Sequence, residues 1–341
     1  MSFDPEPNRP PPSASTSRWW RVLAWRPWRS RPSVAVALPR SRWLRALLAL
    51  LLLPIVYFVG GALWVHRIGD DADFAPRSVA PGESHLVAAI AGLITREVDD
   101  HRWTPMDPWF MPSGLLDNMP NFQTGIAKAS ARVTVELRDQ LGRTRASSVI
   151  DKDLDTAASR LNSAANVWFF DTSVSWLPTT PSSTQYRAGR DSLIAYNKRL
   201  GAGQAMFERR SDTLQAMLQR MANDLGAASA QIDQHITTHG GALIDWNADN
   251  LFYANKGELY AYYVMLRAMT ADFQALLQER GVTQAWQRMV DTFRTAATMQ
   301  PWVVVNGRPD SQFMPSHLTS QGFYLLRART QLREIIDILQ R

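Results

Sequence analysis

The sequence contains no cysteine and little that points to enzyme chemistry. Its 341 residues include no Cys and only six His, which excludes disulfides, thiol catalysis and cysteine-ligated metals. It has no glycine-rich phosphate loop and no nucleophile elbow, and no tandem repeat recurs at about 20 to 50 residues. We therefore predict no catalytic, cofactor-binding or metal-binding residue. The lack of cysteine is compatible with a periplasmic location.

One long uncharged run stands near the N-terminus. Residues 46–65 carry no charged side chain, and as a helix rising about 1.5 Å per residue they would span roughly 30 Å, the thickness of a bilayer's hydrocarbon core. Trp43 and Trp64 bracket the run, at positions that suit the headgroup level. We expect a single transmembrane helix. The alternative, a cleaved signal peptide, is disfavoured by the length of the run and of its basic leader.

The charges around this run predict its orientation. The first 45 residues carry nine arginines and two acidic residues, a net charge of +7. Short Arg-rich flanks stay on the cytoplasmic side, so we expect residues 1–45 to be a cytoplasmic tail at a bacterial inner membrane and the C-terminal domain to be periplasmic. Because the whole chain carries +6, the remainder sums to −1. The basic pI therefore gives no support for nucleic-acid binding.

The N-terminal tail interleaves arginine with tryptophan between Arg18 and Arg29. Each basic residue near an anionic leaflet contributes about 1 kcal/mol of attraction, and Trp partitions to the interface. The tail is thus predicted to lie on the anionic inner leaflet. The alternative is a disordered tail whose arginines only enforce topology.

The rest of the chain is predicted to be mostly α-helical. Residues 66–83 are acidic at their start and contain proline, as expected of a linker, and residues 84–341 form a helical periplasmic domain. Apolar residues at spacings of three and four predict helices that start at Ser84 and cover 121–141, 151–165, 282–299 and 316–340. The β-branched run at 303–305 followed by Asn306-Gly307 predicts at most one short β-hairpin.

Two heptad-patterned stretches lie in the middle of the chain. Residues 182–238 contain no proline, and a second apolar stripe runs from Phe252 to Leu277. A continuous helix over the first stretch would be about 85 Å long, so it either forms a coiled-coil arm or breaks near Gly201–Gly203. Two such helices joined by Gly240-Gly241 predict a long antiparallel coiled-coil hairpin, because each stripe can bury the other.

Several polar patterns imitate chemical sites. His235 and His239 have a spacing that suits a shared metal, but a role at a helix end is favoured because no Glu follows His235. The stretches 151–155 and 245–250 resemble the start of calcium loops without the terminal Glu. We interpret the acids of the first as N-cap and first-turn residues of a helix, and Lys256 at the twelfth position of the second disfavours calcium there. Residues 99–101 could serve acid–base work, and a polar helix end is the favoured interpretation.

Aromatic residues concentrate in the connecting loops instead of on the helical stripes. Such aromatics pack as a cap over the end of a bundle, or they line a groove for a lipid, glycan or peptide. The candidate interaction residues in and beside these loops are Trp109, Asp117, Asn118, Asn121, Trp176 and Trp302.

Several motifs are specific enough to indicate a family. They include Asp107-Pro108-Trp109, residues 118–123, Phe207-Glu208-Arg209-Arg210, residues 302–307 and residues 323–334. Together they resemble a bacterial family of single-pass inner-membrane proteins of unknown function, DUF2333. The resemblance covers the membrane segment and the C-terminal domain but not the Arg/Trp tail. It implies a proteobacterial envelope protein and assigns no catalytic residue.

Two functions remain open from these observations. The favoured one is a non-enzymatic, membrane-anchored envelope protein, which acts as a scaffold or accessory subunit of a membrane or cell-wall assembly and has another envelope protein as its partner. The alternative is a periplasmic enzyme or a lipid- or glycan-binding protein with a site in the Trp–Pro loops, which would use Asp107, Asp117, Asp171 or His317. No cofactor is expected for the favoured function.

Overall fold

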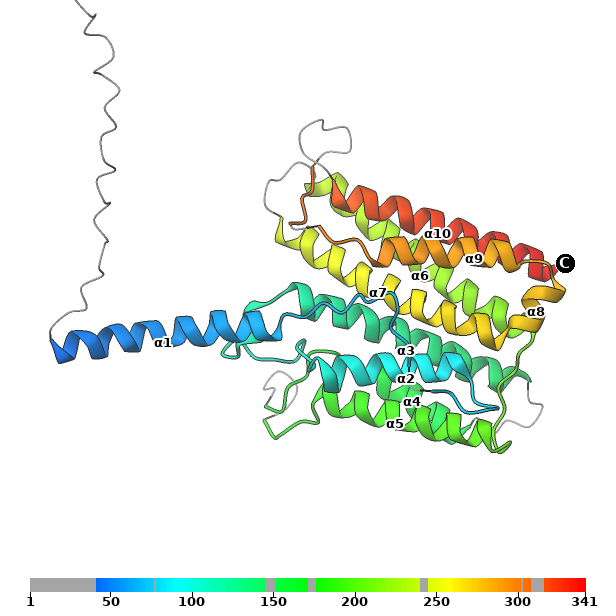
Figure 1. Ribbon diagram of the computed structural model, residues 1–341, viewed down its shortest axis with the longest axis horizontal. Helices are drawn as coiled ribbons and strands as arrows, with labels where there is room; N and C mark the ends of the chain where they lie inside the picture. Colours follow the sequence, from blue (N-terminus) through cyan, green and yellow to red (C-terminus); the bar gives the residue numbers. More distant parts are fainter. Residues whose placement is uncertain are drawn as a thin grey trace, which may run out of the picture. The chain divides into compact units, whose positions relative to one another are not determined.

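The computed structural model of the chain describes residues 41–76, 78–144, 151–170, 176–239, 245–301, 303–307 and 316–341. Contacts divide the chain into two units, residues 1–52 and 53–341. Within these described ranges the chain is helical and contains no strand, which confirms the predicted mostly α class. Figure 1 shows the helices of the second unit lying side by side, with their axes close to one direction.

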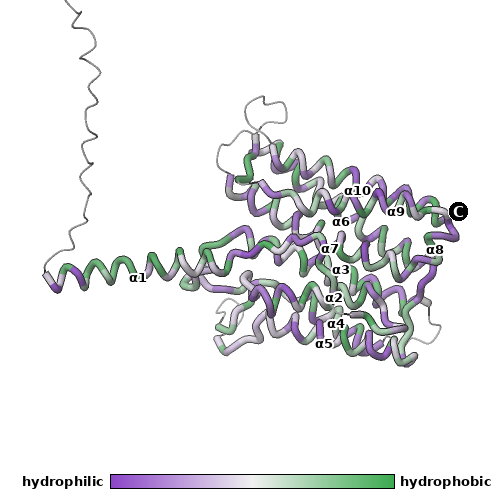
Figure 2. Tube along the Cα trace, viewed as in Figure 1, coloured by the Kyte–Doolittle hydropathy of each residue, from purple (hydrophilic) through white to green (hydrophobic). Residues whose placement is uncertain are grey.

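The first described helix, α1 (Arg42–Val65), contains the uncharged run that the sequence singles out. It continues through Pro54, and none of its residues is buried. Figure 2 shows hydrophobic colouring along nearly all of α1, whereas the helices of the second unit mix both colours. Of the helices described, α1 alone is long and apolar enough to cross a membrane.

The remaining elements form the helical domain. In chain order they are α2 (His85–Thr95), η2 (Arg96–Asp100), η3 (Pro112–Leu115), α3 (Asn118–Thr144), α4 (Lys152–Leu161), α5 (Ser182–Gly201), α6 (Ser211–His239), α7 (Trp246–Asp272), α8 (Gln274–Glu279), α9 (Thr283–Ala297) and α10 (His317–Gln340). The predicted helix starts at Ser84, Asp151 and Ser316 are confirmed, because each side chain caps the first turn of its helix. Short polar side chains satisfy the free N–H groups there.

The centre of the domain is α7, which is buried on every side. All residues from Leu259 to Leu266 are buried, and α7 contacts α3, α9 and α2. Its closest approach is to α3, where Gly125 and Gly257 face the opposite backbone. A Cβ at Gly125 would overlap the carbonyl oxygen of Ala254, and one at Gly257 would overlap that of Phe122. Only glycine permits this approach.

The predicted coiled-coil hairpin is wrong in its pairing. The long proline-free stretch breaks between α5 and α6, where Gly203 has a φ of 68°. The apolar stripe of α6 packs mainly on α10, and α7 packs mainly on α3, so α6 and α7 share few contacts. A heptad stripe predicts that one face is buried, but it does not identify which helix covers that face. The break near Gly201–Gly203 agrees with one of the two outcomes that the sequence predicts for this stretch.

The segment between α1 and α2, expected to be a linker, lies along α7. Tyr260 and Tyr263 donate from their hydroxyls to the backbone oxygens of Asp71 and Ala72, at 2.8 and 2.9 Å. Arg267 donates to the oxygens of Ala72 and Phe74. Side chains of α7 thereby satisfy backbone oxygens of a segment whose described residues form no helix or strand.

The predicted tight turn at Asn306-Gly307 is also corrected. Asn306 forms an antiparallel bridge with Ser316, and His317 N–H donates to the oxygen of Val305 at 3.0 Å. Asn306 therefore pairs across a connection of several residues and cannot be the centre of a two-residue turn. It is 1% exposed, and its amide donates to Asp245 at 3.0 Å, so its role is internal.

Candidate functional site

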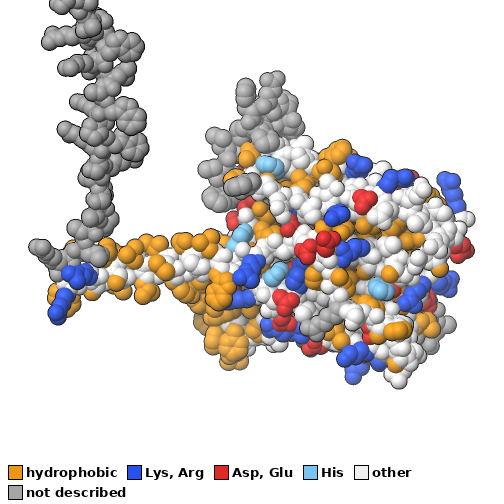
Figure 3. Space-filling view, viewed as in Figure 1, with side chains coloured by type: hydrophobic (Ala, Val, Ile, Leu, Met, Phe, Trp, Pro, Cys, Tyr) orange, Lys and Arg blue, Asp and Glu red, His pale blue; other side chains and the backbone are white. Residues whose placement is uncertain are grey.

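Exposed apolar side chains, most of them aromatic, stand on two loops at an end of the domain, the loop before α3 and the loop between α4 and α5. We call this surface the aromatic patch, and its residues are Trp109, Phe110, Leu115, Phe169, Phe170 and Trp176. Trp109 is 80% exposed and Trp176 is 91% exposed, values that are unusual for the largest apolar side chain. Figure 3 shows hydrophobic side chains gathered at the end of the domain beside α1.

Edge-to-face ring contacts connect the two loops that carry the patch. Phe110 contacts Trp109 at 5.8 Å and the half-buried Trp168 at 5.6 Å between ring centroids. Trp168 in turn contacts Phe170 at 6.0 Å, and Phe169 contacts Phe170 at 4.7 Å. Such offset geometries are the favoured ones for aromatic pairs. The exposed rings are thus held against each other and form a preformed surface.

The base of the Trp–Pro loop is fixed by a buried amide. Gln123 of α3 accepts from the N–H and the hydroxyl of Thr104 at 2.9 and 2.8 Å. Its amide nitrogen donates to the backbone oxygens of Glu97 and Arg102 at 3.1 and 2.9 Å. Because Gln123 is fully buried, each bond replaces one lost to water. The loop therefore leaves a rigid origin.

Trp103 and Asp107 of the same loop are internal. Trp103 is 1% exposed, donates to the oxygen of Ala165 at 2.8 Å and packs on Tyr186 with centroids 4.7 Å apart. Asp107 accepts from Ser113 and, at 3.3 Å, from Arg102. Trp103 thus fits the bundle-cap interpretation, whereas Trp109 and Trp176 do not. Asp107 holds its own loop together.

A polar cluster lies where α3 and α7 begin. Asn121 donates to Asn250 at 2.8 Å and to the backbone oxygen of Asp117 at 2.8 Å. With its amide oriented to donate, Asn118 bonds the Asp117 carboxylate at 3.1 Å and also reaches that of Asp249. Burial, together with the charge of Asp117, raises the pKa of Asp249 to about 6. The cluster joins the starts of the two central helices.

The structure divides the six predicted interaction residues between two places. Trp109 and Trp176 belong to the aromatic patch, and Asp117, Asn118 and Asn121 belong to the polar cluster. Trp302 and Asp171 lie outside the described residues. The prediction omitted Phe110, Leu115, Phe169 and Phe170 from its candidate residues. Their loop positions were visible in the sequence, but their exposure depends on tertiary contacts.

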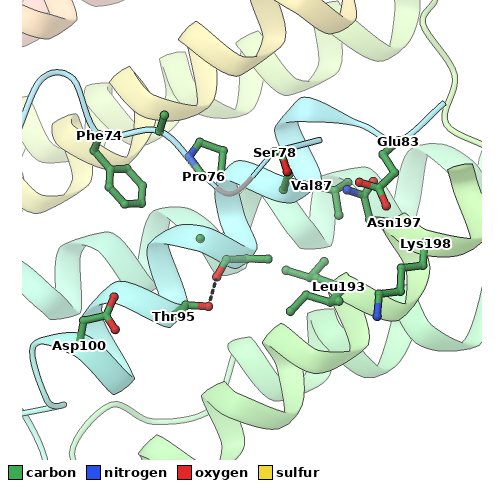
Figure 4. A pocket seen from close by; sticks show the side chains of 15 residues that line it. Phe74, Pro76, Ser78, Glu83, Val87, Thr95, Asp100, Leu193, Asn197 and Lys198 are labelled. Carbon is green, nitrogen blue, oxygen red and sulfur yellow. Dashed lines mark hydrogen bonds between the residues drawn. The ribbon is translucent and has the colours of Figure 1, made fainter. Parts of the chain in front are cut away.

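A groove of about 490 Å³ lies elsewhere, and it is bounded by α2, by α5 and by the segment that follows α1. Its lining includes small or apolar residues such as Ala88, Gly92 and Ile194, and Lys198 and Asp100 lie at its edges (Figure 4). None of the predicted interaction residues lines it. The sequence signal that could have located it is the run of small residues on α2, which leaves space where a larger side chain would fill.

The histidines and acids that imitate metal sites have structural roles. His235 stacks on His239 with centroids 4.8 Å apart, and its Nε2 lies 2.7 Å from Asp245. Asp245 also caps α7, so the calcium-like stretch 245–250 is the first turn of a helix. Val305 N–H donates to Nδ1 of His317 at 2.9 Å. No group of three or more metal-ligand side chains converges within the described parts of the chain.

Comparison with known proteins identifies a family for most of the chain. The model of the family described as an uncharacterized protein conserved in bacteria, DUF2333, matches residues 106–241 and 242–341. No curated protein and no solved structure shows a significant match.

Proposed function

The chain belongs to the DUF2333 family of bacterial proteins, and we propose that it is a non-enzymatic envelope protein anchored in the inner membrane by α1. Residues 1–45 are its cytoplasmic tail, and the helical domain is periplasmic. In this role the domain is a scaffold or accessory subunit of a membrane or cell-wall assembly. Its partners are the bilayer, the anionic inner leaflet contacted by the Arg/Trp tail, and another envelope protein.

The observation that carries this proposal is the contrast between α1 and the domain. All the residues of α1 are unburied although the helix is almost wholly apolar. Burying a leucine side chain is worth about 1.5 to 3 kcal/mol, so a helix with eight leucines exposed to water is strongly disfavoured. A bilayer supplies the missing apolar surroundings, and the arginines before the helix favour a cytoplasmic N-terminus.

The scaffold role is supported by how the domain uses its buried charges. Asp272 of α7 accepts from Ser84 Oγ and from the N–H groups of His85 and Leu86, at 2.8, 3.0 and 2.8 Å. Arg96 pairs with Glu97 at 2.7 Å and donates to Tyr260 at 2.6 Å. Asp272 thus connects α7 to the start of α2, and Arg96 connects η2 to α7. Buried polar contacts of this kind make a domain rigid, as expected of a scaffold.

Topology and extraction test this function together. Alkaline phosphatase fused after Arg341 should be active and green fluorescent protein at the same position should be dark, because only the former matures in the periplasm. Alkaline carbonate should leave the intact chain in the membrane pellet. Replacing Leu51, Leu52 and Leu53 by arginine should release it, since charge at the centre of a span costs about 3 kcal/mol per residue. A fluorescent C-terminal fusion or a carbonate-soluble wild type would contradict the proposal.

The alternative, a lipid- or glycan-binding protein or a periplasmic enzyme, is favoured by one observation, the 490 Å³ groove. Its volume falls within the range of small-molecule sites, about 300 to 1,000 Å³. Native mass spectrometry of the detergent-released chain tests it: a bound molecule should be lost on Ala88→Leu, which places a larger side chain in the groove lining. A spectrum of the bare chain, unchanged by that variant, would leave the scaffold role.

A further inference from the structure

The aromatic patch directly adjoins the C-terminal half of α1. Pro112 of η3 packs so closely on Gly61 that a Cβ built there would lie 2.5 Å from the Pro112 ring. On the same side of α1, Phe58, Ala62 and Val65 are half-buried, whereas Leu63 and Trp64 on the other side are exposed. The loop from Trp109 to Leu115 therefore leaves the domain beside α1, at a known position along it.

That position corresponds to a shallow depth in a bilayer. Gly61 precedes Val65, the end of α1, by about 6 Å along the helix axis, at 1.5 Å per residue. If the hydrocarbon core covers residues 46–65, Pro112 lies just inside its outer boundary. Side chains that anchor proteins to one leaflet are buried to about 5 to 10 Å. The two depths agree.

We propose that the aromatic patch inserts into the periplasmic leaflet of the membrane that α1 crosses, so that the domain has a second, interfacial contact with that membrane. This inference depends on the proposed function, because it requires α1 to span the bilayer. Trp109, Phe110, Leu115, Phe169, Phe170 and Trp176 contribute the apolar surface. Arg102 is exposed and bonds Met111 of the same loop, where its guanidinium group can meet lipid phosphates.

Chemistry and continuity favour a bilayer as the occupant. Tryptophan and phenylalanine with leucine are the residues of interfacial anchors, since their rings suit the boundary between headgroups and chains. The patch contains no charged side chain. Insertion into lipid at this depth requires that absence of charge. The loop that carries Trp109, Phe110 and Leu115 also contacts the apolar surface of α1 directly, where Pro112 meets Gly61. A second protein surface would have to cover the patch while avoiding the membrane that begins at that contact.

Site-directed spin labelling tests the proposal cleanly, because the chain has no cysteine. The full-length protein carries one nitroxide at Leu115→Cys, Leu50→Cys or Leu326→Cys, in nanodiscs of phosphatidylcholine and phosphatidylglycerol. Collision rates are measured with oxygen, which concentrates in lipid, and with a water-soluble nickel complex. All three side chains are exposed in the folded chain, so labelling should preserve the fold, which circular dichroism checks.

We expect the label at Leu115→Cys to favour oxygen, as the label at Leu50→Cys does, and the label at Leu326→Cys on α10 to favour nickel. Nickel preference at Leu115→Cys with oxygen preference at Leu50→Cys would overturn the inference and leave the anchor intact. Exclusion of both reagents at Leu115→Cys would mean that protein covers the patch, and would also overturn it. Nickel preference at Leu50→Cys would instead refute the proposed function.

A second set of variants separates insertion from simple proximity. Adding Trp109→Ser and Trp176→Ser to the Leu115→Cys chain should shift its label towards the nickel complex, because the rings that hold the loop in the leaflet are gone. Phe323→Ser on α10, an exposed aromatic outside the patch, should leave the label unchanged. If the double substitution has no more effect than Phe323→Ser, the patch does not hold the domain at the membrane.

Discussion

The ammonium nitrogen of Lys256 lies 2.7 Å from a carboxylate oxygen of Asp70, and this pair joins the segment after α1 to the middle of α7. Lys256 is 2% exposed. Asp70 also accepts from the Gln300 amide at 3.0 and 2.8 Å. A lysine on the central helix of the core thus fixes the chain that leads from the proposed anchor into the domain.

Removing the acid of this pair should harm the protein more than removing the base. Asp70→Ala leaves a buried ammonium group without its counter-ion, a change that costs about 3 to 5 kcal/mol. Lys256→Met removes that charge with a side chain of similar length, and Asp70 keeps its bonds to Gln300, so the loss should be smaller. Urea unfolding of the detergent-solubilised chain, followed by circular dichroism, measures both. Equal losses would mean that the pair is not electrostatically coupled.

The acidic pair at the start of α7 should make stability depend on pH. The pKa of Asp249 is raised to about 6, above the unfolded value of about 3.9, so the folded state holds a proton that the unfolded state releases. The stability that this proton contributes is complete below pH 4 and is lost as the pH rises through 6. Asp249→Asn should therefore raise the melting temperature relative to wild type above pH 7 and change it little at pH 4.

Asp337→Asn, on an exposed part of α10, is the matched control for the loss of one negative charge. It should alter the melting temperature little at either pH. A stabilisation by Asp249→Asn that is the same at pH 4 and pH 8 would show that Asp249 does not titrate in this range in the folded protein.

The cap that α7 provides for α2 should be one of the most sensitive polar sites. Asp272→Ala removes three hydrogen bonds to the first turn of α2 and leaves buried N–H groups without an acceptor. We expect a loss of about 3 kcal/mol in the free energy of unfolding. Asp337→Ala should change it by less than about 0.5 kcal/mol. Thermal and urea unfolding measure both variants. Similar losses in the free energy of unfolding would mean that Asp272 does not stabilise the contact between α7 and α2.

Replacing a glycine by alanine at the close crossing of α3 and α7 should destabilise the protein. Gly125→Ala or Gly257→Ala places a methyl group against a backbone carbonyl of the facing helix and should cost about 2 kcal/mol or more, because neither helix can move without opening the core. Gly322→Ala in α10 meets only Ile232, at 3.6 Å, and should stabilise by up to about 1 kcal/mol through helix propensity. Opposite signs in thermal unfolding verify this; a destabilising Gly322→Ala would contradict it.

Most of the helix positions could be predicted because their signals are local. Ser84, Asp151 and Ser316 begin helices by bonding N–H groups a few residues away, so three or four positions of sequence contain the whole interaction. Gly201 and Gly203 are a local signal of the same kind, and they predict the break there as one of two outcomes. The pairing of α6 with α10 and of α7 with α3 involves residues far apart in the chain, and periodicity does not specify such partners.

The candidate site was only partly predictable. Trp103 and Trp109 stand in one Trp–Pro loop, yet one is buried against Tyr186 and the other is exposed beside Phe110. Their local sequence context is the same, so it does not predict which of the two tryptophans is buried. The start of this loop is likewise fixed by a residue distant in sequence, because the Gln123 amide on α3 bonds the backbone where the loop leaves η2.

What the sequence determined alone is the apolar helix α1, the helical class of the domain and most helix boundaries, because hydrophobic runs, spacing and caps act over a few residues. The tertiary structure decided which helices pair, that α7 is enclosed on all sides, and which aromatic rings remain exposed next to Gly61. These depend on which surfaces exclude water from one another. The exclusion of water between two surfaces depends on contacts between segments that are distant in the sequence, so it cannot be predicted from any one segment alone.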